Sequence, residues 1–224
     1  KVAMPKKFSI DDSMIIRPDR KKKDVEVIRG PNIGILPRSP ELADTIHGLV
    51  TIKVGDKITT DHIIPAGARM KYRSNIPKYS EFVFENVDPT FAKRAMSIRQ
   101  DGKQNIIVAG HSYGQGSSRE HAALCPMYLG VRAVIAKSFE RIHAANLINF
   151  GILPLTFSAE SDYDYISQED ILEMTEVKKT IAGDGKFLMR NKTKGTAFYA
   201  TCILSERQKQ IILAGGALNM TNEE

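Results

Sequence analysis

The sequence predicts an α/β domain with a mixed sheet and a βαβαβ core. Short apolar runs alternate with helix-like segments, at residues 105–109, 117–129, 133–136, 139–150 and 152–157. Strands that alternate with helices are joined by right-handed crossovers and pair in parallel. Two further strand-like runs, 186–190 and 196–204, flank the turn-forming stretch Asn191–Gly195 and predict an antiparallel pair. Parallel and antiparallel strands together indicate a mixed sheet.

The composition is that of a globular protein outside the membrane. Hydrophobic residues make up 42% of the 224 residues and charged residues 26%, which is ordinary for a domain with a packed core. No apolar run approaches the roughly 18–20 residues that a membrane span needs. The first residues lack the apolar stretch of a signal peptide. The absence of an initiating methionine indicates a fragment of a longer chain.

The two cysteines, Cys125 and Cys202, do not form a C-x-x-C pair. That usage predicts a reducing compartment rather than a disulfide framework. Iron–sulfur clusters take several cysteine thiolates, so we expect no cluster held by this chain alone. The histidines show no ligand spacing such as H-x-x-x-H, and we expect no other metal.

Residues 1–40 are expected to form an extended arm, and residues 41–224 the domain. Prolines punctuate the arm, at Pro5, Pro18, Pro31, Pro37 and Pro40. The formal net charge is +6, partly from the basic run Arg17–Lys23. A basic balance is typical of nucleic-acid binding, but no aromatic residue interleaves this run to stack on bases. A solvated linker is the favoured interpretation, and RNA binding is an alternative.

Local signals place further elements along the domain. Leu49–Val54 alternates as a strand does. Thr60 or Asp61 is expected to cap a short helix or turn. Ser205 and Gln208 have the spacing of a capping box, in which two side chains satisfy free N–H groups at a helix start. That spacing predicts a last helix.

The stretch Gly110–His121 carries the functional prediction. It follows a buried strand and precedes a helix, an arrangement that points backbone N–H groups and the positive end of a helix dipole at an anion. Gly114 and Gly116 let the backbone approach a bound group, and Arg119 adds a five-donor fork that suits a carboxylate. The dinucleotide fingerprint fails because Arg119 replaces its third glycine, and no Gly-Lys-Ser/Thr ends the loop as a Walker motif requires.

A structural role competes for the same residues. Ser117 and Glu120 have the S-x-x-E spacing of a capping box at the start of the helix. Capping accounts for these two residues, and Ser118 is a second candidate for the cap. Capping does not explain why two glycines, a second serine and Arg119 occur in the same short stretch. A ligand site is therefore favoured over a cap alone.

The loop also resembles the C-terminal swivelling domain of the aconitase family, through the run Tyr113-Gly-Gln-Gly-Ser-Ser-Arg-Glu-His-Ala-Ala-Leu124. Further motifs follow in the aconitase order, at Thr59–Ile63, Lys71–Arg73, Lys137–Phe139 with Arg141–His143, Leu153–Phe157 and Ala214–Asn219. The likeness covers residues 48–219. The wider family includes homoaconitase and the small subunit of isopropylmalate dehydratase.

The resemblance implies a swivelling β/β/α domain that supplies part of a hydro-lyase active site. In the family, citrate and isocitrate are interconverted through cis-aconitate, and a 4Fe-4S cluster held by other domains polarises the leaving hydroxide. The implied partners are those cluster-bearing domains, or a large subunit, and a tricarboxylate substrate. The implied location is the cytoplasm, or the mitochondrial matrix in a eukaryote.

The matched motifs also imply the roles of individual residues. Ser117 is the catalytic base, acting as an alkoxide. Three residues bind substrate carboxylates, namely Arg73, Ser118 and Arg119. Four residues stand beside the site and support it, namely Asp61, His62, Gly114 and Gly116.

The motifs divide on specificity. Asp61-His-Ile-Ile-Pro65 is similar to the isopropylmalate dehydratase small subunit, whereas Lys71-Tyr-Arg73 is aconitase-like. Arg73 fits a third carboxylate, which isopropylmalate lacks. An aconitate hydratase is therefore favoured. The alternatives are an isopropylmalate dehydratase or homoaconitase domain, and an RNA-binding regulatory module without catalysis.

Overall fold

The computed structural model describes residues 4, 7–17, 26 and 28–221. The chain divides into two units, Lys1–Pro31 and Asn32–Glu224. The described residues of the first unit form no helix or strand, and Phe8, Ile10 and Ile16 are exposed there. Apart from Arg17, the basic run predicted as a linker lies outside the described residues.

The second unit begins with extended chain that is hydrogen-bonded to the rest of the unit. The Gly34 N–H donates to the Ser74 carbonyl at 2.8 Å, and Asn219 Nδ2 donates to the Ser39 carbonyl at 2.8 Å. Residues 34–40 of the expected arm therefore pack against this unit. The boundary at residue 40 stays a prediction.

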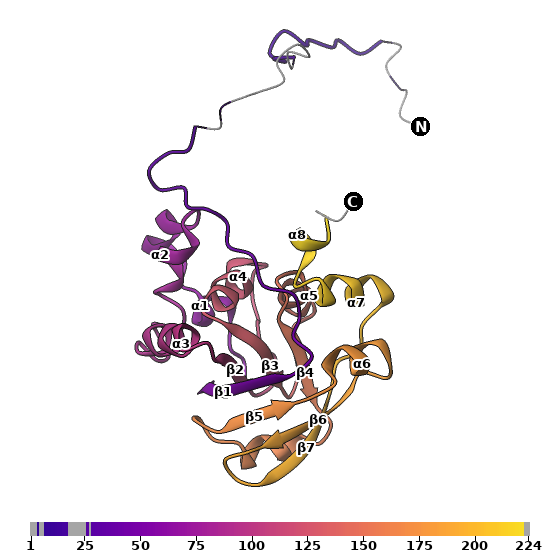
Figure 1. Cartoon of the computed structure of the whole chain (residues 1–224). Helices are drawn as coiled ribbons and strands as arrows, with labels where there is room; N and C mark the ends of the chain where they lie inside the picture. Colours follow the sequence, from indigo (N-terminus) through magenta and orange to yellow (C-terminus); the bar gives the residue numbers. More distant parts are fainter. Residues whose placement is uncertain (1–3, 5–6, 18–25, 27, 222–224) are drawn as a thin grey trace. The chain divides into compact units, whose positions relative to one another are not determined.

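The described residues of the second unit form seven strands, which close into a barrel in the order β1-β2-β3-β4-β7-β6-β5 (Figure 1). Their bounds are β1 Ile46–Lys53, β2 Gln104–Ala109, β3 Val131–Ala136, β4 Leu153–Phe157, β5 Ile171–Met174, β6 Lys186–Asn191 and β7 Thr196–Thr201. Strands β1 to β4 pair in parallel, and the remaining pairs are antiparallel. The mixed α/β sheet is confirmed, whereas its closure into a barrel was not predicted.

Helices and 3-10 turns lie between these strands, and two further helices, α7 and α8, follow the last strand (Figure 1). They are α1 Thr60–Ile63, η1 Gly67–Tyr72, α2 Ile76–Ser80, α3 Phe91–Gln100, α4 His121–Tyr128, α5 Arg141–Asn149, η2 Glu160–Tyr165, α6 Val177–Ala182, α7 Glu206–Leu213 and α8 Ala217–Met220. Ser205 caps α7 together with Gln208, as the spacing predicts. The sequence did not predict β5, a four-residue strand too short for a clear alternation pattern.

The parallel strands are buried on both faces, which explains why they read as continuous apolar runs. One face packs against helices α1 to α4, in a cluster that includes Ile107, Val134, Tyr79, Phe84 and Leu124. The other face meets the hairpin strands, in a cluster that includes Ile106, Val108, Ile135, Leu155, Phe187 and Met189. The ends of β2 and β3 are therefore supported by densely packed residues on both faces of the sheet.

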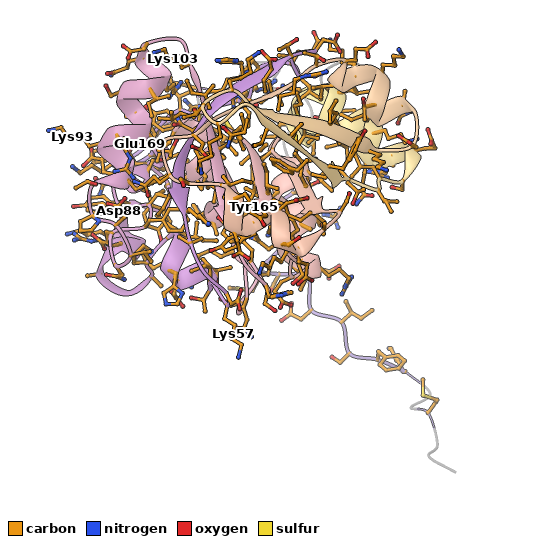
Figure 2. All side chains as sticks on the ribbon, turned by 90° about the horizontal axis from the view of Figure 1, so that it is seen from below. Lys57, Asp88, Lys93, Lys103, Tyr165 and Glu169 are labelled. Atoms are coloured by element: carbon orange, nitrogen blue, oxygen red, sulfur yellow. The ribbon has the colours of Figure 1, made fainter. Side chains whose placement is uncertain are left out.

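Charged side chains are distributed around the periphery of this core. Figure 2 shows Lys57, Lys93 and Lys103 pointing outward, away from the packed interior. Such side chains keep their charge in water and contribute little to stability.

A buried asparagine ties the start of β2 to its neighbours. Asn105 is fully buried, and its Nδ2 donates to the carbonyls of Ala95 at 2.9 Å and Leu129 at 2.8 Å. Its Oδ1 accepts a hydrogen bond from the Thr51 hydroxyl. The side chain thus connects β1, the helix α3 and the residue that follows α4. This network holds the helices against the sheet on the side away from the glycine loop.

We expect Asn105→Ala to lower the free energy of unfolding by about 3 kcal/mol or more, because it leaves buried polar groups unpaired. Ser205→Ala, which removes an exposed cap, should cost about 1 kcal/mol. Urea unfolding followed by circular dichroism measures both. Equal losses in the two variants would show that the Asn105 network contributes no more than a surface cap.

Candidate functional site

The glycine loop that follows β2 is hydrogen-bonded to chain on both of its sides. The N–H groups of Gly114 and Gln115 donate to the Ile58 carbonyl at 2.8 and 3.1 Å. The Tyr113 N–H donates to the Ser138 carbonyl at 3.0 Å, just beyond the end of β3. Gly114 and Gly116 have φ of 88° and 108°, values that favour glycine. The loop is therefore fixed between the segment before α1 and the segment before α5.

The competing interpretation of Ser117 as a helix cap is wrong. Helix α4 begins at His121, Glu120 occupies the N-cap position, and no side chain caps this helix. Ser117 lies four positions before the helix, and its carbonyl accepts a hydrogen bond from Thr60 Oγ1 at 3.2 Å. Ser118 does not cap the helix either. Both serines are exposed, and among the described residues neither hydroxyl has a hydrogen-bond partner.

The loop faces the first turn of α5 across a cavity of about 250 Å³. From the loop side it is lined by Gly114, Gly116, Ser117, Ser118 and Arg119, and from the α5 side by Glu140, Arg141, Ile142, His143 and Asn146. Thr60 completes the lining. The structure thus brings most of the predicted site residues together. It also corrects the prediction of which helix start faces them, because no residue of α4 lines the cavity.

The first turn of α5 offers free hydrogen-bond donors. The Glu140 side chain makes no cap, and within the described chain the N–H groups of Arg141, Ile142 and His143 have no acceptor. A helix start with free N–H groups carries partial positive charge and attracts anions. The sequence contained a signal that the glycine loop faces α5. The loop follows β2 and α5 follows β3, and the ends of neighbouring parallel strands meet at one edge of a sheet.

Only one of the three nitrogens of the Arg119 guanidinium is hydrogen-bonded to described residues. Its Nη1 donates to Asp61 Oδ1 at 2.7 Å and to the Ile64 carbonyl at 2.8 Å. The hydrogen bond from Arg119 lowers the pKa of the Asp61 carboxyl. The Nε and Nη2 groups of Arg119 make no bond to a described residue, so the guanidinium retains donors for a ligand.

The residues around α1 are arranged differently from the prediction. Thr59, rather than Thr60 or Asp61, caps α1 and forms a capping box with His62. His62 Nδ1 accepts the Thr59 N–H at 3.1 Å. The physical reason is that the other two side chains are engaged elsewhere, Thr60 with the Ser117 carbonyl and Asp61 with Arg119. Asp61 therefore supports the cavity through Arg119, and His62 does not line the cavity.

Arg73 lies outside the Ser117 cavity. It is exposed, follows η1, and lines a neighbouring cavity of about 440 Å³ together with Glu120 and His121. His121 Nε2 donates to the Arg73 carbonyl at 2.9 Å. The structure therefore places Arg73 beside the predicted site but not in it.

His143 and Tyr113 form a buried pair beneath the loop. Their ring centroids lie 5.2 Å apart. A Cβ added to Gly114 would lie 2.2 Å from His143 Cγ, so the glycine passes directly over the imidazole. Burial lowers the pKa of His143 to about 4, which leaves the ring uncharged at neutral pH. The sequence favoured an ordinary helix histidine with satisfied hydrogen bonds at this position, whereas both ring nitrogens lack a partner among the described residues.

The cysteines do not fit an iron–sulfur cluster. Cys125 and Cys202 are both buried, and burial raises the pKa of each thiol to about 12, which disfavours the thiolate that a cluster requires. The described residues contain no group of three or more side chains that could hold a metal ion. In the same residues, no helix is long and apolar enough to span a membrane.

Comparison with known proteins points to one family. The model of the aconitase C-terminal domain matches residues 56–160, which include β2, the glycine loop, α4, β3 and α5. A crystal structure of 3-isopropylmalate dehydratase from Methanocaldococcus jannaschii superposes with a TM-score of 0.65 at 30% sequence identity. That match covers 80% of this chain and 94% of the solved one.

Curated relatives are similar over most of the present chain but are much longer. Homocitrate dehydratase, mitochondrial, of Saccharomyces cerevisiae is 34% identical over 91% of this chain and 29% of its own length. A probable mitochondrial aconitate hydratase of Caenorhabditis elegans is 36% identical over 78% of this chain and 25% of its own length. The chain thus spans about a quarter of the length of these relatives.

We expect Gly114→Ala to disrupt the loop, because it combines the cost of positive φ, about 1–2 kcal/mol, with overpacking against His143, about 1–3 kcal/mol. Gly67→Ala is the matched control: φ is 54° there, and a Cβ would meet nothing within 4 Å. It should show the φ cost alone. Urea unfolding gives the two losses, and equal values would show that His143 does not restrict this position.

Proposed function

Because the chain belongs to the aconitase C-terminal domain family, we propose that it is the part of a hydro-lyase that supplies a serine base and carboxylate-binding groups. One observation carries the proposal. The Ser117 hydroxyl has no partner in the described chain, and it stands at a cavity whose other wall is a helix start with free N–H groups. A hydroxyl without a hydrogen-bond partner, close to several free N–H donors, is suited to abstracting a proton from an anionic substrate.

Ser117 is proposed as the base. A serine hydroxyl is far too weakly acidic to ionise unaided, so the alkoxide needs nearby positive charge. Two features supply it at this cavity: the Arg119 guanidinium and the first turn of α5. Fixed donors aimed at a developing oxyanion stabilise it strongly in a site that excludes water. The absence of a capping role for Ser117 removes the one competing use of its oxygen.

Carboxylate binding falls to three residues in this proposal. Ser118 and Arg119 line the cavity beside Ser117 and bind one carboxylate. Arg73, which is exposed in the neighbouring cavity, binds a second carboxylate outside the Ser117 cavity. Arg73 has no acidic partner among the described residues, so its charge is available. Asp61 keeps Arg119 oriented, and Gly114 and Gly116 shape the loop.

The enzymes of this family carry a 4Fe-4S cluster in the full protein, and neither cysteine of this chain fits such a cluster. We propose that the cluster belongs to the part of the protein that this chain does not include, as further domains or as a large subunit. The residues described here then contribute base, carboxylate binding and water exclusion, and no step involving the cluster is assigned to them.

For the substrate we propose citrate and isocitrate, interconverted through cis-aconitate. Arg73 supports a third carboxylate, and a named aconitate hydratase is among the relatives. Homocitrate and isopropylmalate are the alternatives, because a homocitrate dehydratase and an isopropylmalate dehydratase are similar as well. Both curated relatives are mitochondrial by name, which favours the mitochondrial matrix over the cytoplasm. RNA binding gains no support from the described residues.

Replacing Ser117 by Ala in the complete enzyme should lower kcat by about 10²–10⁴-fold with little change in substrate binding, because a base acts mainly in the transition state. Ser205→Ala is the control: it removes a true cap and should melt earlier while turning over normally. Steady-state kinetics on cis-aconitate and thermal melts decide. A Ser117→Ala enzyme with normal kcat would refute the assignment of the base.

Replacing Arg119 by Lys should raise KM by about tenfold to a hundredfold and lower kcat, because an ammonium keeps the charge but not the planar fork. Arg69→Lys serves as the control. Arg69 also makes a two-bond pair, with Glu85 at 3.1 and 3.0 Å, but it does not line the cavity. If both variants keep normal KM values, carboxylate binding does not depend on the Arg119 fork.

A further inference from the structure

Three buried side-chain polar atoms lack a hydrogen-bond partner within the described part of the chain, and all belong to two neighbouring residues. They are Tyr113 Oη and both ring nitrogens of His143. Other buried polar groups are paired, as for Asn105 with Ala95. Buried polar atoms are paired in native proteins as a rule, so an unpaired group of this kind calls for a physical explanation.

His143 lies at the cavity in which we place the ligand. It belongs to the first turn of α5, is 2% exposed, and lines the cavity together with Ser117 and Arg119. Gly114 passes directly over its ring. An unpaired imidazole is therefore part of the cavity wall, between the loop and the free N–H groups of the helix start.

The state of the ring determines what it can bind. The low pKa of His143 leaves it uncharged at neutral pH, and a neutral imidazole has one N–H donor and one acceptor nitrogen. Both nitrogens are shielded from bulk water. A ligand oxygen that accepts the N–H therefore makes its bond with little competition from solvent, in surroundings where hydrogen bonds are strong.

We infer that His143 is a further ligand-binding residue of this cavity, whose imidazole N–H donates a hydrogen bond to an oxygen of a bound hydroxy-polycarboxylate. The inference rests on the proposed function, since it takes the same ligand class. The inference requires only a small shift at Gly116, which makes no backbone hydrogen bond among the described residues, while the bonds of Gly114 and Gln115 to Ile58 stay in place. A Cβ on Gly116 would meet only Thr60 Oγ1, at 3.5 Å, so the loop has space on that side.

A competing explanation is that the ring only fills space beneath Gly114. The two explanations differ in what they require of the nitrogens. A filler works equally well as a phenylalanine ring, whereas a ligand-binding residue does not. Tyr113 offers a matched control, because Tyr113→Phe removes the other unpaired atom and leaves the ring in place.

The experiment is a titration of the 224-residue chain with citrate at low salt, followed by NMR of isotope-labelled histidine rings and of backbone amides. The His143 signal is identified by its loss in His143→Gln. We expect a neutral ring whose signal moves with the same Kd as the amides of Gly116–Arg119. His143→Phe should weaken citrate binding about tenfold, equivalent to about 1.4 kcal/mol, while Tyr113→Phe leaves the Kd unchanged.

The outcomes separate this inference from the proposed function. If citrate moves the loop amides but not the His143 ring, and His143→Phe binds normally, the role of His143 is refuted while the proposed function stands. If citrate moves neither, both are refuted. A thermal melt checks the fold of each variant, and should His143→Phe fail to fold, the ring titration of the unmodified chain decides.

Discussion

The site depends on the backbone hydrogen bonds that hold the glycine loop on both sides. Ile58 accepts from Gly114 and Gln115 on one side, and Ser138 accepts from Tyr113 on the other. These bonds are possible because β1, β2 and β3 are parallel neighbours whose ends meet at one edge of the sheet. The same constraint sets the helix that faces the loop: the chain leaving β3 enters α5 directly opposite.

This constraint explains the residue types at the cavity. The positive φ values at Gly114 and Gly116 turn the chain toward α5, and the imidazole of His143 occupies the space that a side chain at Gly114 would need. Ser117 lies before α4 and does not cap it, so its hydroxyl has no hydrogen-bond partner among the described residues. Positive charge then comes from Arg119 and from the free N–H groups of α5, so serine and anion-binding groups converge although they belong to different elements.

The sequence was sufficient for features that local pattern determines. The alternation of strands and helices, the hairpin of β6 and β7 and the cap at Ser205 were predicted and are observed. The helix predicted over 117–129 begins only at His121, which also rules out the competing cap at Ser117, because spacing alone does not show where a helix begins when glycines with positive φ precede it. The barrel closure and the position of Arg73 depend on contacts between distant segments, which one sequence does not reveal.

The central claim is that an anionic ligand binds between the glycine loop and the first turn of α5, rather than at the start of α4. The most direct measurement follows the backbone amide signals of both helix starts during a citrate titration at low salt. The account predicts that the amides of Arg141, Ile142 and His143 move together with those of Gly116–Arg119, while those of His121–Ala123 stay in place. Movement at His121–Ala123 with no change at Arg141–His143 would contradict it.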